Sequence, residues 1–206
     1  MKNLKKIKKE KIMDGKFFIK NFLDGWNYVK ESRKFIYFVL CLFLAFALIG
    51  AFISAPSYIV DAIKEFIKKL LEATAGLNIY EMIAYIFWNN LVASFFGLFL
   101  GAIICIPSII ICVVNGYVLG YVAKATILSS SIFSLWRIFP HGIFELPAVF
   151  ISLGLGIKLG MSLFFWNADK EFLRRFFLSI KVFFFIVLPL LVVAAIIEGV
   201  LIGFIK

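Results

Sequence analysis

A stretch of 42 residues without a charged side chain, from Met82 to Ala123, constrains the fold of this chain more than any other feature. A helix rises about 1.5 Å per residue, so about 20 residues cross the hydrocarbon core of a bilayer. The stretch is long enough for two crossings, and Pro107 divides it into spans near 83–106 and 107–123. Because their connection carries no charge, we expect these two spans to form a tight hairpin.

Three further apolar runs have the length of a span, near 35–53, 146–165 and 182–204. At 63% hydrophobic residues, the 206-residue chain holds more apolar surface than a soluble domain of this size buries in one core. We therefore predict an all-α fold, a polytopic membrane helix bundle of about five transmembrane helices. Residues 1–34 form a basic cytoplasmic segment, and 35–206 form a single transmembrane domain. The 34 residues before the first apolar run argue against a cleavable signal peptide.

Two amphipathic segments flank the first span. Residues 16–34 mix phenylalanines with lysines and follow a tail with six lysines between Lys2 and Lys11. This segment either lies on an anionic leaflet or packs on the cytoplasmic loops of the protein, and the sequence favours neither reading. Residues 57–75, which Ser57 begins and Gly76 ends, have an apolar and a charged face. They are too short and too charged to cross, so we expect them at the membrane surface.

The connection between the third and fourth spans has its own signals. Residues 129–139 are too short to cross, and their serines and apolar residues predict an interfacial or re-entrant segment. Pro147 disfavours helix at the residue before it, which predicts irregular backbone over 141–146. At membrane depth, such backbone needs cover from protein or water.

The distribution of basic residues predicts the orientation. With the N-terminus inside, the inner segments hold the eleven Lys and Arg before residue 35 plus Lys170, Arg174, Arg175 and Lys181, which makes 15. The outer segments hold six, and Lys158 lies within the fourth span. The positive-inside rule then predicts a protein of the cytoplasmic membrane with its N-terminus inside and its C-terminus outside. A position beside the membrane already accounts for the basic N-terminal segment, so we expect membrane lipids and no nucleic acid as a partner.

Ionisable and amide side chains are rare within spans, and each is a functional candidate. Six fall in the outer half of the predicted bilayer or near its middle: Asn89, Asn90, Asn115, His141, Glu145 and Glu198. They suit a structural hydrogen-bond network best and a transport or ligand site next. One His and one Glu are too few ligands for a closed zinc site, so we expect no metal, no cofactor and no catalytic residue. We interpret Lys158 as snorkelling to the cytoplasmic headgroups.

Glycines four residues apart predict close contacts between helix backbones. Three such pairs occur, Gly97 with Gly101, Gly116 with Gly120, and Gly156 with Gly160. They predict a tight central unit of the second, third and fourth spans. That unit either packs within one subunit or builds a homodimer, which is the oligomeric state that we expect.

The string His141-Gly-x-x-Glu145-x-Pro147-Ala148 opens a span with Gly154, Gly156 and Gly160, and it resembles the stage II sporulation protein M family of polytopic membrane proteins. The resemblance runs from about Asn89 to Gly160 and includes the glycines of the second and third spans. It implies a non-catalytic anchor. In spore-forming bacteria the family's named member recruits two cell-wall hydrolases to the septal membrane, whereas members elsewhere have no defined role.

Together these features predict a non-enzymatic scaffold that recruits protein partners at the membrane. His141, Glu145 and Asn115 would hold the central helices together, and residues 57–75 would offer the docking surface. The alternative is a small transporter or lipid-handling protein that uses the outer polar side chains.

Overall fold

The computed structural model describes residues 2–53, 55–129, 139–163 and 168–205 of the chain, and all regular structure in these ranges is helical. The helices follow in this order: α1 (Lys2–Glu31), α2 (Arg33–Phe52), α3 (Ser57–Thr74), α4 (Ile79–Ile103), α5 (Ile106–Ser129), α6 (Phe139–Ser162), α7 (Ala168–Val182), the π-helical turn η2 (Phe183–Val187) and α8 (Leu188–Ile205). Five helical stretches are long and apolar enough to cross a membrane: Arg33–Phe52, Ile79–Ile103, Ile106–Ser129, Gly142–Ser162 and Lys170–Ile202. The predicted all-α bundle with five candidate spans is confirmed.

The second span ends three residues earlier than predicted, and the third begins one residue earlier. Helix α4 ends at Ile103, and α5 begins at Ile106, so Pro107 lies in the first turn of α5. A proline fits there because its missing N–H would have no partner within the helix. The two-residue connection makes a hairpin, but α5 packs along α2 much more than along α4.

The prediction of irregular backbone over 141–146 is wrong. Helix α6 is continuous from Phe139 to Ser162 and contains Pro147 in its interior. One proline removes one helical hydrogen bond, whereas an irregular segment at membrane depth would leave several backbone groups without partners. The helix is therefore the less costly conformation. Most of the segment predicted to be interfacial, residues 130–138, lies outside the described residues.

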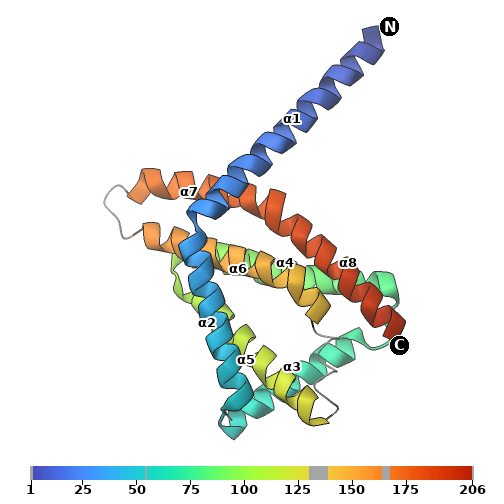
Figure 1. Cartoon of the computed structure of the whole chain (residues 1–206), viewed down its shortest axis with the longest axis vertical. Helices are drawn as coiled ribbons and strands as arrows, with labels where there is room; N and C mark the ends of the chain where they lie inside the picture. The colour runs from blue at the N-terminus through green and yellow to red at the C-terminus, as the bar shows by residue number, and fades with distance from the viewer. Residues whose placement is uncertain (1, 54, 130–138, 164–167, 206) are drawn as a thin grey trace.

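The spans form two groups that meet at α6. Helices α4, α6 and α8 run side by side, and α2 pairs with α5 (Figure 1). Helix α6 contacts both groups. In its most apolar stretch of 18 residues 67% of the residues are buried, against 17% in that of α2. Helices α1 and α3 lie at opposite ends of the spans, and their axes are nearly parallel, with the chain running in opposite senses along them (Figure 1). We call these two ends of the bundle the α1 end and the α3 end.

The contact between α4 and α6 depends on glycines of both helices. A Cβ atom on Gly101 would lie 3.0 Å from Cα of Gly156, and one on Gly160 would lie 3.0 Å from the backbone nitrogen of Cys105. No side chain fits between backbones at such distances. The hydroxyl of Ser108 donates a hydrogen bond of 2.7 Å to the carbonyl of Gly97 and joins the start of α5 to this contact.

The other glycines let α5 and α6 pack closely against the backbone of α2. A Cβ on Gly116 of α5 would lie 2.6 Å from the carbonyl oxygen of Phe43, and one on Gly154 of α6 would lie 3.0 Å from the backbone nitrogen of Ile36. Gly120 likewise faces Ala47. All seven glycines that the sequence singled out are thus buried against helices of the same chain. They build the inside of one subunit, and a homodimer has to rest on other surfaces.

Candidate functional site

Three of the six polar residues that the sequence singled out within the spans interact from three different helices. The side chain of Asn90 on α4 hydrogen-bonds the carboxyl group of Glu145 on α6, and Glu145 interacts electrostatically with Glu198 on α8. Each of the three is half-buried. We call Asn90, Glu145 and Glu198 the polar cluster. Two acidic groups that interact within a bundle can share a proton or a cation, or can be held apart by amide hydrogen bonds.

The remaining members of the predicted set are not brought into this cluster. Asn115 is exposed on α5, and its amide donates a 2.8 Å hydrogen bond to the carbonyl of Ile111 in its own helix. Its expected place in the central network is therefore corrected, because α5 turns away from α4 to pack on α2. Asn89 is exposed on α4. The backbone of His141 lies in the first turns of α6, and its side chain lies outside the described residues.

Lys158 provides a larger correction. It does not snorkel to the headgroups but is buried, with 4% of its surface exposed. Its ammonium lies 2.8 Å from Oε1 of Glu31 and 3.0 Å from the hydroxyl oxygen of Ser32. It also lies 4.1 Å from the ring centroid of Tyr28, a cation–π contact. The three partners lie where α1 meets α2, so this junction packs on α6 at Lys158.

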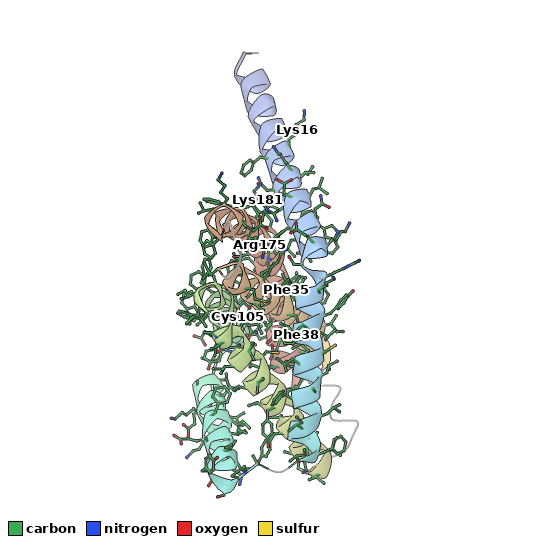
Figure 2. All side chains as sticks on the ribbon, turned by 90° about the vertical axis from the view of Figure 1, so that its left-hand side faces the viewer. Lys16, Phe35, Phe38, Cys105, Arg175 and Lys181 are labelled. Carbon is green, nitrogen blue, oxygen red and sulfur yellow. The ribbon has the colours of Figure 1, made fainter. Side chains whose placement is uncertain are left out.

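Helix α7 extends this ionic group. Arg174 donates a 3.1 Å hydrogen bond to the same oxygen of Glu31 and a 3.0 Å bond to Glu171. Arg175 binds Glu171 at 2.7 Å and donates to the backbone carbonyl of Lys158 at 3.2 Å. Figure 2 shows Arg175 and Lys181 close to the last turns of α1, at the same end of the bundle. We call this set the Lys158 network: Tyr28, Glu31, Ser32, Lys158, Glu171, Arg174 and Arg175.

The charge states of the α1 residues fit this arrangement. Burial works to raise the pKa of Glu31, but hydrogen bonds and charges from Lys158 and Arg174 outweigh it and hold the pKa below its ordinary value. Burial raises the pKa of Tyr28 to about 12, although the nearby Ser179 hydroxyl opposes this. At neutral pH Glu31 is therefore ionised and Tyr28 is protonated, which suits a carboxylate that accepts hydrogen bonds from Lys158 and Arg174.

The Lys158 network is a structural joint. The buried amine of Lys158 is engaged by a carboxylate, a hydroxyl and an aromatic ring. The network fastens α1 to α6 and α7, and Lys181 adds a second tie at 2.8 Å from Asp24. Among the described residues, no three His, Cys, Asp or Glu side chains gather as metal ligands.

These features define a multi-pass membrane protein whose central helix contacts its neighbours backbone to backbone. The chain matches the model of the stage II sporulation protein M family over residues 39–201 and belongs to that family. The match covers the polar cluster and Lys158, and it begins after α1. An uncharacterized protein of Methanocaldococcus jannaschii is 31% identical over 178 residues, which cover 79% of this chain and 76% of the relative. No solved structure matches the chain.

Proposed function

We propose that this protein is a non-catalytic scaffold that anchors or recruits partner proteins at the cytoplasmic membrane. The observation that supports it best is the way α6 is held on two sides. Gly156 and Gly160 lie against α4, and Gly154 lies against α2. Helices in backbone contact cannot separate to open a path without losing most of their packing. Such a bundle suits a protein that holds surfaces in fixed positions.

The orientation that we propose places the α1 end in the cytoplasm. Counting the segments that the structure puts at this end, α1, the start of α2, and α7, gives the 15 basic residues of the sequence prediction, against Lys64, Lys68, Lys69 and Lys124 among the described residues at the other end. Positive charge is retained on the cytoplasmic side during insertion. Helix α3 then lies on the outer surface, beside the ends of the spans (Figure 1).

Helix α3 is the docking surface in this proposal. Ile63 is the one residue of α3 that is buried. Its charged face is exposed and ordered by pairs one turn apart, with Lys69 at 2.8 Å from Glu65 and Lys68 at 3.8 Å from Glu72. A folded partner with complementary charges could bind this face without entering the membrane.

Replacing the three lysines of the α3 face by glutamate is expected to reduce partner recovery about tenfold. Each exposed charge pair is worth about 0.5 kcal/mol, so three of them amount to about that factor. The change is Lys64→Glu, Lys68→Glu and Lys69→Glu, and the measurement is quantitative co-purification after cross-linking in cells. The matched control reverses Lys5, Lys6 and Lys8 at the other end of the molecule. If every partner survives the α3 change, α3 is not the docking surface.

A second candidate function is supported by the polar cluster. Ionisable groups within a membrane are costly, and they commonly mark proton or ion pathways. Glu145 on α6 interacts with Glu198 on α8 and with Asn90 on α4. A small transporter would use this cluster as its proton-coupled or cation-coupled site.

For the transporter, Glu145→Gln is expected to abolish proton flux across proteoliposomes while leaving the protein folded, because the amide cannot carry the proton. A trapped pH-sensitive dye reports the flux, and thermal unfolding reports the fold. Asn115→Ala, an exposed change outside the cluster, is the control and is expected to retain full flux. No flux in the unaltered protein, together with a lower melting temperature of the Glu145 variant, would favour the structural role of the cluster.

A further inference from the structure

Helix α1 has three distinct sides between residues 15 and 31. One side is buried against α7 and η2 and includes Asn21, Gly25 and Tyr28. A second side is polar and includes Lys16, Lys20 and Asn27. The third side is an exposed apolar row, with these exposed fractions: Phe18 54%, Ile19 59%, Phe22 39%, Leu23 51% and Trp26 41%. Five large apolar side chains on one helix face form a continuous patch that needs an occupant.

The contacts of α1 lie at the boundary between charged sequence and the last span. Asp24 pairs with Lys181, the last basic residue before the apolar run 182–204. One residue further along α1, a Cβ on Gly25 would lie 3.6 Å from Val182 and 3.5 Å from Ile186. The middle of α1 thus lies where charged sequence gives way to the last span. In a bilayer this is the interfacial layer.

The apolar row is also continuous with a surface that faces lipid. The ring of Phe18 packs edge-on against Phe185 of η2, with centroids 5.1 Å apart. Its neighbour Phe184 is 58% exposed on the last span. An apolar surface therefore passes from the last span onto α1 without a polar interruption. A water-soluble partner would have to cover both parts of it.

The direction of α1 agrees with this position. Helix α1 extends beyond the bundle, and its axis is nearly parallel to that of α3, which lies at the opposite end (Figure 1). Two amphipathic helices at opposite ends of a bundle, both aligned across the spans, have the geometry of helices that lie in the two interfaces of one bilayer.

The basic residues of α1 favour lipids with anionic headgroups. The first 20 residues contain eight lysines and two acidic residues. Lys16 and Lys20 are exposed beside the apolar row. We propose that α1 lies in the headgroup layer of the membrane that the bundle spans, with its apolar row inserted among the acyl chains of anionic lipids. The Lys158 network holds the end of α1 at the depth that this insertion requires. The proposal does not depend on whether the protein is a scaffold or a transporter.

Quenching of Trp26 fluorescence by lipids tests the proposal. Trp88, Trp136 and Trp166 are replaced by Phe, so that Trp26 is the remaining tryptophan of the full chain. The protein is reconstituted in phosphatidylcholine bilayers in which roughly a quarter of the lipid is phosphatidylglycerol. Two samples are prepared: in one the acyl chains of phosphatidylcholine carry bromine, and in the other those of phosphatidylglycerol do. We expect strong quenching, greater per molecule with brominated phosphatidylglycerol, and protection of Trp26 from aqueous iodide.

Two variants sharpen this test. In a Trp26→Phe background, Asn27→Trp moves the fluorophore to the polar side, where iodide and not the brominated lipid should quench it. The double change Lys16→Gln and Lys20→Gln should remove the preference for phosphatidylglycerol. Each lysine near an anionic surface contributes about 1 kcal/mol, so the affinity of α1 for anionic lipid should fall by up to about 30-fold. If iodide quenches Trp26 in both brominated samples, the proposal is overturned. Equal quenching of Trp26 by the two brominated lipids would overturn it as well.

Discussion

The variant Glu31→Gln is expected to destabilise this protein by about 2–3 kcal/mol, whereas Lys158→Met is expected to cost less than about 1 kcal/mol. Both changes remove the same ion pair, but they leave different groups behind. Glu31→Gln leaves a buried ammonium without its carboxylate, because Lys158 is 4% exposed. Lys158→Met leaves Glu31, which is half exposed and still binds Arg174 at 3.1 Å. Methionine fills a similar volume and packs well against the Tyr28 ring.

The double variant carries the sharpest part of this prediction. With Met at 158 there is no buried charge to satisfy, so adding Glu31→Gln should cost little, and the double variant should be nearly as stable as Lys158→Met alone. Unfolding free energies of the four proteins in one detergent, compared as a double-mutant cycle, give the coupling. If Glu31→Gln is harmless, the ammonium of Lys158 reaches other acceptors, as the snorkelling interpretation required.

The variant Gly156→Ala is expected to lower the stability by about 2–3 kcal/mol, which is about 5–10 °C in melting temperature for a chain of this length. The direction of this change in stability is informative, because alanine in place of glycine normally stabilises a helix by about 1 kcal/mol. At this position the added methyl group would lie 2.7 Å from the Ser108 hydroxyl and would collide with the carbonyl of Gly97. Helices α4 and α6 would have to separate, and the hydrogen bond between Ser108 and Gly97 would be lost.

Gly142→Ala is the matched control for this prediction. It makes the same chemical change in the same helix, but the nearest atom to the new methyl group is 3.4 Å away, on the flexible side chain of Leu146. We expect its melting temperature to equal or slightly exceed that of the unaltered protein. The two temperatures come from one thermal unfolding series. A Gly156→Ala protein as stable as the Gly142→Ala protein would show that α4 and α6 are not in backbone contact.

Several features of the fold could be predicted from the sequence because they are local. The length of an apolar run determines whether a helix can cross a bilayer, so the five spans follow from composition along the chain. The amphipathic pattern between Ser57 and Gly76 likewise predicted α3, which ends at Thr74 with Gly76 at a φ of +81°. The string around His141 and Glu145 predicted the family, and the match over 39–201 confirms it.

Other features depend on how helices far apart in the sequence are rotated and paired. Lys158 and Glu31 are 127 residues apart, and no periodicity in either segment indicates the other. The glycine pairs showed that backbones would meet, but not that Gly156 would face α4 and Gly154 would face α2. Asn90 and Asn115 looked equivalent as amides within spans, and α5 pairs with α2, which leaves Asn115 outside the polar cluster.

The amino-acid sequence by itself determined that the chain crosses the membrane with about five helices, because burial of apolar length in lipid is a property of each segment alone. The tertiary structure decided which polar groups have partners. Buried charges and amides are satisfied across helix interfaces, and those interfaces exist only after the backbones have packed together. Lys158 therefore changed from a side chain expected at the headgroups to the centre of the joint between α1, α6 and α7.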